Sequence, residues 1–334
     1  MKKLRKPLLK RNRFYNDSND KGGSPFMLTL DIVVQYYELL KKKPSRCRTV
    51  WTEKVKPAKL SLDPLITWIG HSSFLVQIGG FNILLDPIFG DVSFFLKRII
   101  PLGMTIKQMP HIDFVLISHN HRDHMDGTSL LAVKNRSADV TILVPEGDKH
   151  WFDRRGFART YEHTWWQQRS FKLKKGQSEI TFTFLPAVHW SQRGFFDHNK
   201  SLWGSWMIEW EDHQVYFAGD TSYGLHFKEI SQEFKNISAA LLPVGPCEPH
   251  DLLAGTHLNA QQAGQAFLDL RAKHMIPMHW GAFPFGVEHF DLPIKRVQVW
   301  WKKNQEKLKD RFLHCVKAGQ AFALSMLHSR VRAG

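Results

Sequence analysis

The sequence is poor in cysteine and has no long hydrophobic run. It holds three cysteines among 334 residues, an odd number, with no Cys-x-x-Cys pair. This argues against a disulfide framework and against a zinc site built from thiolates, and it favours a reducing compartment. No apolar stretch approaches the ~18 residues needed to span a bilayer, and no apolar segment of a signal peptide follows the charged start. We therefore expect a cytoplasmic protein, with peripheral membrane association left open.

Negative charge is scarce in the first sixth of the chain. Residues 1–56 contain 15 Lys and Arg but five Asp and Glu, so they account for most of the net charge of +15. We therefore divide the chain into a basic N-terminal arm at 1–58 and a body at 59–334, which is long enough for a large core. The arm is expected to meet an anionic membrane surface. No nucleic acid is expected, because no motif for binding DNA or RNA accompanies it.

An amphipathic helix is predicted inside this arm. Ser24 and Pro25 fit an N-cap and a first helical position. Apolar residues then recur with helical spacing from Phe26 to Tyr37, and three lysines follow at 41–43. The helix either docks on the body, which we favour, or lies on an anionic surface.

Short apolar or alternating segments predict β-strands throughout the body. These segments are 65–69, 74–78, 82–85, 114–117, 141–145, 180–184, 206–210, 215–218 and 275–278. A helix is predicted after Asn259, which forms a loose capping box with Gln262, and a last helix is predicted over 294–312. Many strands with interspersed helices predict two sheets packed face to face with helices outside.

Six residues just after the 114–117 strand are rich in metal-ligand side chains. They are His-Asn-His-Arg-Asp-His at 119–124. Packing does not call for such a cluster, because buried imidazoles are costly unless paired. His189, Asp220 and His279 each follow another predicted strand, so loops at one edge of the sheets can bring all these side chains together. The pattern predicts a metal site.

The candidate ligands comprise five histidines and two aspartates, too many for one tetrahedral ion but suited to two. The assignment is His119, His121 and His189 on the first ion, Asp123, His124 and His279 on the second, and Asp220 as the bridge. A water or hydroxide shared by ions ~3.5–4 Å apart becomes a nucleophile near neutral pH and can attack phosphorus. The cofactors are therefore expected to be two zinc ions, and iron or manganese would also suit these ligand types.

These residues and their strand contexts resemble the metallo-β-lactamase superfamily. Its fold is a four-layer αβ/βα sandwich of the α+β class with a dinuclear site at one edge. Within it, the chain is similar to the branch that contains N-acyl-phosphatidylethanolamine-hydrolysing phospholipase D and its bacterial relatives. The resemblance covers roughly residues 60–290 and rests on segments 67–72, 86–89, 118–126, 186–190, 196–206, 218–221 and 279–281.

The resemblance implies hydrolysis of a phospholipid phosphodiester, from N-acyl-phosphatidylethanolamine to N-acylethanolamine and phosphatidic acid. It also implies His257 as a catalytic residue beside Asp123. His257 would position phosphate oxygens or protonate the leaving alkoxide, or it is simply a hydrogen-bonded loop residue. His71 and Asp86 are expected to orient ligand imidazoles through their second nitrogen.

Two other functions stay open at this point. A lactonase or a soluble phosphoester hydrolase of the same superfamily would turn over soluble substrates without needing vesicles. A non-catalytic scaffold, in which metals hold the fold while the basic arm docks on lipid, would have a closed site. Acyl-chain length, headgroup preference and oligomeric state, a homodimer included, are not specified by these patterns.

Aromatic residues cluster in three further places, the first of which lies in a stretch where the resemblance is weak. They occur in the 94–100 segment and in the pairs at 165–166 and 195–196. Such stripes more often belong to the core. The alternative is an apolar, basic lip that accepts lipid.

Overall fold

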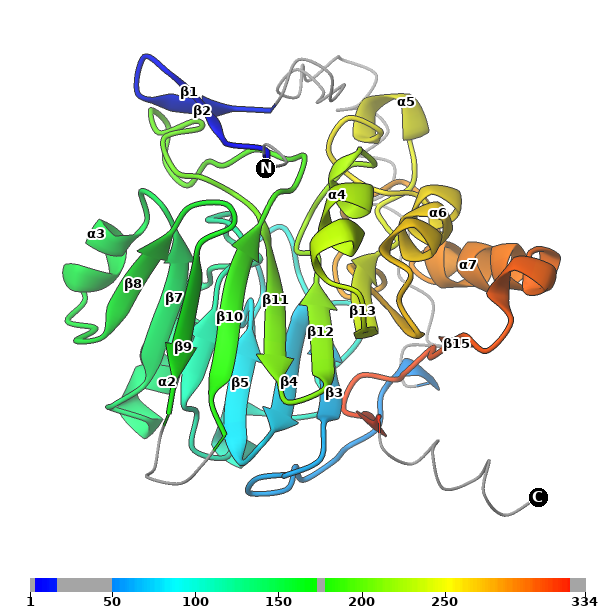
Figure 1. Ribbon diagram of the computed structural model, residues 1–334. Coiled ribbons are helices and arrows are strands. Elements are labelled where there is room, and N and C mark those ends of the chain that lie inside the picture. The colour runs from blue at the N-terminus through cyan, green and yellow to red at the C-terminus, as the bar shows by residue number, and fades with distance from the viewer. Residues whose placement is uncertain (1–3, 17–49, 173–177, 325–334) are drawn as a thin grey trace.

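Two seven-stranded β-sheets pack face to face, with helices on their outer sides (Figure 1). The structure, a computed structural model, describes residues 4–16, 50–172 and 178–324. The first sheet has the order β15-β14-β13-β12-β11-β10-β9 and the second the order β16-β3-β4-β5-β6-β7-β8. This is the αβ/βα sandwich expected from the sequence.

The strands and helices have the following bounds. The first sheet consists of β9 (Gln168–Phe171), β10 (Ile180–Leu185), β11 (Ser205–Trp210), β12 (His213–Phe217), β13 (Ile237–Pro243), β14 (His274–Met278) and β15 (Phe312–Leu313). The second consists of β3 (Leu65–Gly70), β4 (Ser73–Ile78), β5 (Phe81–Leu85), β6 (Phe114–Leu116), β7 (Thr141–Pro145), β8 (Thr160–His163) and β16 (Ala321–Ala323). A separate hairpin pairs β1 (Leu8–Lys10) with β2 (Arg13–Tyr15). The α-helices are α2 (Gly127–Arg136), α3 (Lys149–Asp153), α4 (His226–Glu233), α5 (His250–Leu253), α6 (Ala260–Leu270) and α7 (Leu292–Lys303), and the 3₁₀ helices are η2 (Ile106–Gln108) and η3 (Gln305–Leu308).

Strand β4 illustrates how the layers are held together. Successive strand residues point to opposite faces of a sheet. Phe74 and Val76 accordingly join the large core between the two sheets. Leu75 joins a second apolar cluster that contains Leu130 of α2 and Phe152 of α3. Both faces of the second sheet are therefore buried, which explains its nearly continuous apolar strands.

The sheet topology gathers the carboxyl ends of many strands at one edge. Strands β5 to β8 are parallel to one another, as are β12 to β15. Strands β3 and β10 run in the same direction as their parallel neighbours, because two antiparallel pairings separate them from β5 and β12. Loops after β3, β5, β6, β10, β12 and β14 therefore leave from the same edge.

The predicted elements agree with the structure in most places, with one error near the C-terminus. Helix α6 begins with the predicted capping box, since Gln262 N donates to Asn259 Oδ1 at 2.9 Å and Asn259 N donates to Gln262 Oε1 at 3.1 Å. The prediction of one helix over 294–312 is wrong beyond Lys303. The 3₁₀ helix η3 follows there, and β15, whose backbone pairs with the edge of β14, begins at Phe312. The strands that were not predicted are β1, β2, β8, β9, β13, β15 and β16.

The first described residues of the predicted arm belong to the folded body. The β1–β2 hairpin docks through Phe14 N, which donates to Asn199 O at 2.8 Å. Arg5 Nε lies 3.0 Å from Glu229 Oε2, and Trp166 Nε1 donates to Arg5 O at 2.8 Å. The predicted amphipathic helix lies outside the described residues, and the boundary at 58 stays a prediction. None of the helices in the described ranges is long and apolar enough to cross a bilayer.

Helix α6 packs so closely on α7 that a single methyl group should destabilise the fold. A Cβ at Gly264 would lie 2.5 Å from ring atoms of Trp300. We expect Gly264→Ala to lower the stability by about 1–3 kcal/mol despite alanine's better helix propensity. A thermal melt checks this. The matched control is Gly90→Ala, where a Cβ would meet nothing within 4 Å; equal melting temperatures for the two variants would contradict the prediction.

Candidate metal centre

Three imidazoles from two loops converge on one point. His119 and His121 follow β6, and His189 follows β10. His119 Nε2 lies 2.8 Å from His121 Nδ1, and His189 Nε2 lies 3.3 Å from the same atom. Nitrogen ligands of a tetrahedral ion at ~2.0–2.1 Å stand about 3.3 Å apart, so this spacing fits one metal ion. These are the residues assigned from the sequence to the first ion.

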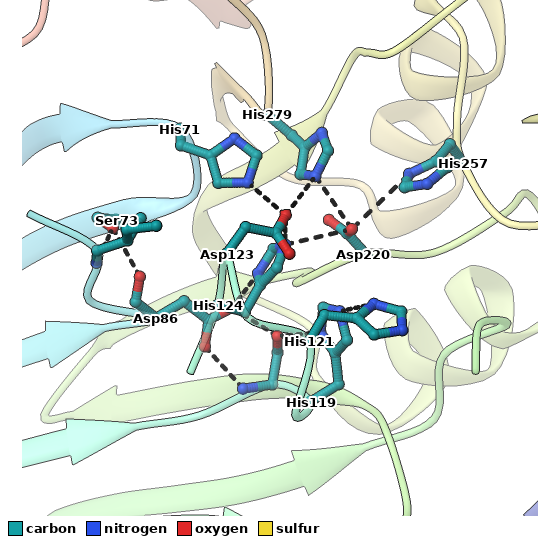
Figure 2. A network of polar contacts seen from close by, with 12 residues as sticks. His71, Ser73, Asp86, His119, His121, Asp123, His124, Asp220, His257 and His279 are labelled. Carbon is teal, nitrogen blue, oxygen red and sulfur yellow. Dashed lines mark hydrogen bonds and ion pairs between the residues drawn. The ribbon is translucent and has the colours of Figure 1, made fainter. Parts of the chain in front are cut away.

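A second group surrounds Asp123 (Figure 2). Asp123 Oδ2 lies 3.3 Å from His124 Nε2 and 3.8 Å from His279 Nε2. His124 comes from the loop after β6, and His279 directly follows β14. The structure thus brings together the three residues assigned to the second ion.

Asp220, at the end of β12, lies between the two groups. Its Oδ2 atom is 3.0 Å from His279 Nε2 and 3.3 Å from His124 Nε2. The same oxygen is 3.9 Å from His189 Nε2, in the first group. Asp220 Oδ2 is therefore the atom that faces imidazole nitrogens of both groups.

Several buried polar atoms of this cluster have no hydrogen-bond partner. Those that face the centre are His124 Nε2, His279 Nε2 and Asp220 Oδ1. Buried polar atoms are nearly always satisfied, so a concentration of unsatisfied nitrogen and carboxylate atoms indicates a missing bonding partner. Imidazole and carboxylate are ligands of divalent metals, so the residues fit such an ion.

Burial and charge set the protonation of the ligands. Burial lowers the pKa of His121 to about 4 and that of His189 to about 3, and it holds the pKa of His119 well below its usual value. These imidazoles are thus neutral near pH 7, the form that binds metals. Burial opposes the charge on His124, yet the Asp220 and Asp123 carboxylates raise its pKa well above its usual value. The two carboxylates therefore require positive charge beside them, from a proton or a divalent cation.

Asp86 fixes the orientation of two ligand imidazoles, as expected. His124 Nδ1 donates to Asp86 Oδ2 at 2.7 Å, which leaves His124 Nε2 facing the centre. Ser118 Oγ donates to the same oxygen at 2.5 Å and lies 2.9 Å from His119 Nδ1. Because the hydroxyl proton goes to Asp86, Ser118 can accept from His119 Nδ1, which leaves His119 Nε2 free. Asp86 itself has a left-handed backbone, with φ of 37°.

The partner of His71 differs from the one expected from the sequence. Its Nε2 atom lies 2.9 Å from Asp123 Oδ2, so it holds a carboxylate rather than an imidazole. Burial lowers the pKa of His71 to about 3, and a neutral imidazole donates one hydrogen bond there. His71 and His279 both have φ of 58°. Such backbone is costly for residues with a Cβ and is often found at functional sites.

Asn16 supports His189 and was not found from the sequence. Its Nδ2 donates to His189 O at 2.9 Å, and His189 N donates to Asn16 Oδ1 at 3.3 Å. The His189 ring is held separately, with Nδ1 2.9 Å from Thr256 O, so Nε2 faces the centre. A lone asparagine 173 positions away from its partner carries no local sequence signal.

Asp148 is a second residue that the sequence did not single out. It is fully buried at the start of α3 and lies behind the metal-ligand loop. Asn120 Nδ2 and Ser201 Oγ donate to its Oδ1 at 3.0 and 2.7 Å. Asn120 stands between His119 and His121, so this contact helps to fix the loop. Burial raises the pKa of Asp148 to about 7.

The raised pKa of Asp148 predicts a pH-dependent stability difference. The folded protein holds this proton more tightly than the unfolded chain, whose Asp pKa is near 3.9. The stability that this proton contributes to the folded protein is therefore fully present below about pH 4, and it is lost as the pH rises through about 7. We expect the free energy of unfolding of Asp148→Asn, relative to that of the parent protein, to rise by up to about 4 kcal/mol between pH 4 and 8.

Urea unfolding of both proteins at pH 4, 6 and 8 tests this expectation. Asp153→Asn, which removes an exposed carboxylate from the same helix, controls for the loss of one negative charge. A stability difference between Asp148→Asn and the parent that stays constant across these pH values would disprove the assignment.

Comparison with known proteins agrees with this geometry. A family model described as beta-lactamase superfamily domain matches residues 81–280. N-acyl-phosphatidylethanolamine-hydrolyzing phospholipase D 1 of Caenorhabditis elegans is 31% identical over 269 residues, which cover 78% of this chain and 75% of that protein. The mitochondrial enzyme of the same name from Saccharomyces cerevisiae is 33% identical over 240 residues, which cover 70% of this chain and 51% of that protein.

A solved structure shares the fold. Igni18, a metallo hydrolase from the archaeon Ignicoccus hospitalis, superposes with a TM-score of 0.58 at 22% identity over 78% of this chain and 97% of its own. Its sequence identity is low, so this likeness bears on the fold alone. The sequence relatives and the His/Asp cluster indicate a metallo-hydrolase that takes a divalent metal. The chain belongs to the beta-lactamase superfamily, in the family of the N-acyl-phosphatidylethanolamine-hydrolyzing phospholipases D.

Proposed function

We propose that this protein is a dinuclear metal phosphodiesterase that hydrolyses N-acyl-phosphatidylethanolamine to N-acylethanolamine and phosphatidic acid. The observation that carries the proposal is the pair of ligand groups that meet at Asp220 Oδ2. Two relatives above 30% identity are named for this reaction. Zinc is the proposed metal.

The chain's own residues determine where the ions and the phosphate sit. His119, His121 and His189 would hold one ion, Asp123, His124 and His279 the other, and Asp220 both. Divalent ions there supply Lewis-acid chemistry that stabilises negative charge on the phosphodiester. The carboxylates of Asp123 and Asp220 would be neutralised by the ions, so His124 could remain a neutral ligand.

A cavity of about 460 Å³ opens beside the first group and is suited to a lipid phosphodiester. It is lined by His121, Arg122, Asp123, Trp190, Gln192, Arg193, Gly194 and Phe195. The two guanidinium groups offer positive charge for a phosphate. Trp190 and Phe195 offer apolar surface for an acyl chain. A phospholipid carries both chemical features.

His257 is placed to act on the substrate. Its Nδ1 atom lies 3.8 Å from Asp220 Oδ2, too far for a hydrogen bond, and has no other partner. Burial lowers its pKa to about 3, so the ring is neutral and one of its nitrogens carries hydrogen. That N–H can donate a hydrogen bond to a phosphate oxygen or to the departing oxygen.

Removal of the metals should abolish turnover. We expect dialysis against a strong chelator to stop hydrolysis of N-acyl-phosphatidylethanolamine in vesicles, and added zinc, iron or manganese to restore it.

Asp220→Asn and His121→Ala should each lose more than about 100-fold in activity, while the surface variant Asp153→Asn should not. Mass spectrometry of the products and elemental analysis of the protein provide the measurements. Full turnover without metal would refute the proposal, and efficient turnover of soluble lactones or phosphoesters alone would favour the related hydrolases.

His257 should affect the chemical step and leave metal content unchanged. We expect His257→Ala to lower kcat by about 10²–10⁴-fold with two metal ions still bound. His257→Gln keeps a hydrogen-bond donor but cannot transfer a proton. Partial recovery in that variant would indicate that His257 positions the phosphate, and no recovery would indicate proton transfer. Unchanged kcat in His257→Ala would rule out both roles.

A further inference from the structure

Two pairs of phenylalanines stand out of the surface. Phe94 and Phe95 are 79% and 75% exposed, and Phe195 and Phe196 are 94% and 86% exposed. In the described part of the chain these are the most exposed of the large hydrophobic side chains. By contrast, Trp165 is buried, so the aromatic segments noted in the sequence divide into core and surface. Adjacent exposed aromatics usually mark an interaction site.

The loop that carries Phe195 and Phe196 borders the cavity at the metal centre. Phe195 itself lines this cavity together with His121 and Asp123. The base of the loop is fixed by Arg193, whose Nη1 donates to Met125 O at 2.7 Å. The aromatic tip is therefore held beside the opening through which substrate must enter.

The loop that carries Phe94 and Phe95 is anchored on the other ligand group. The Arg98 Nη2 atom donates to Ile88 O at 2.8 Å, and its guanidinium lies 4.6 Å from the centre of the Phe283 ring. Phe283 in turn packs on His71, with 5.2 Å between ring centres. Both loops thus leave from the edge of the sandwich that holds the metal centre.

Positive charge accompanies these aromatic tips. Lys97 Nζ lies 5.4 Å from the centre of the Phe94 ring, and Arg122 is exposed at the cavity. The nearby acids are engaged with backbone amides. Asp91 accepts from Arg98 N at 2.8 Å, and Asp197 accepts from Gly194 N at 2.8 Å. These bonds also keep the loops in shape, so the rings do not fold back onto the protein.

The β1–β2 hairpin extends the basic surface beside the 193–197 loop. Arg13 donates through Nη1 to His198 O, and Phe14 N donates to Asn199 O at 2.8 Å. Lys10 and Arg11 lie at the turn of this hairpin, and both are exposed. Figure 1 shows the hairpin above the ends of the strands, on the same side as α5 and the loops after β10.

We propose that Phe94, Phe95, Phe195 and Phe196 insert into the interfacial layer of a phospholipid bilayer. Lys97, Arg122 and the hairpin cations then face lipid phosphates, and the cavity opens directly onto the membrane. Aromatic side chains at loop tips with cations beside them fit the apolar and anionic layers of a bilayer surface. The inference rests on the proposed function in that it explains how a lipid would reach the site.

Vesicle sedimentation tests the proposal without turnover. The probe is 100-nm vesicles of phosphatidylcholine with phosphatidylglycerol, which contain no N-acyl lipid. The variants are Phe94→Ser/Phe95→Ser, Phe195→Ser/Phe196→Ser and all four changes together. The matched control is Leu60→Ser/Leu62→Ser, which removes two exposed apolar side chains before the start of β3, at the opposite edge of the sandwich.

We expect the full chain to bind the vesicles and each double Phe variant to bind roughly tenfold or more weakly. The control should bind like the parent, and all proteins should have equal melting temperatures. The Phe94→Ser/Phe95→Ser variant, whose changes lie outside the cavity lining, should also keep the parent's turnover of a soluble phosphodiester. Unchanged binding in the fourfold variant, or no binding by the parent, would overturn the proposal. A dimeric parent that becomes monomeric in the Phe variants would also overturn it, in favour of a second copy as the partner. If the vesicles bind through the phenylalanines but N-acyl-phosphatidylethanolamine is not cleaved, only the proposed function fails.

Discussion

One carboxylate oxygen, Oδ2 of Asp220, faces imidazole nitrogens of both ligand groups. It lies 3.0 Å from His279 and 3.9 Å from His189, and its side chain is almost completely buried. A buried charge is stable only when opposite charge or hydrogen bonds compensate it. The sandwich meets this condition by ending several strands of the same direction at one edge, where each strand contributes one ligand loop. Asp86, Ser118 and His71 then fix the side chains that these loops deliver.

The grouping of the candidate ligands was predictable because its signal is local. Four of the seven residues lie within 119–124, and the other three each follow a short apolar strand that is visible in the sequence. The helix at Asn259 was predictable for the same reason, since its capping box spans three residues. These patterns need no knowledge of how distant segments pack.

The supporting residues were not predictable because they act over long sequence separations. Asn16 holds His189 through backbone atoms, and any residue type could offer the same backbone groups. Asp148 matters because it is buried beside Asn120. The sequence alone does not tell which aspartates are buried. Helical periodicity over 294–312 did not show that α7 ends at Lys303 or that Phe312 and Leu313 pair with β14. Charge also does not show that Arg5 and Phe14 of the basic segment contact the body.

The wide spacing of the ligands affects how the protein acquires its ions. The second group takes His279 from the loop after β14, so that group is incomplete until β14 has joined its sheet. In small zinc domains, neighbouring ligands make metal binding the driving force for folding. Here the ligand loops leave from two sheets with a large apolar core between them, so the frame does not depend on an ion in the way a small zinc domain does. Metal loading would then follow folding, and the choice of ion would reflect which metals the folded chain meets.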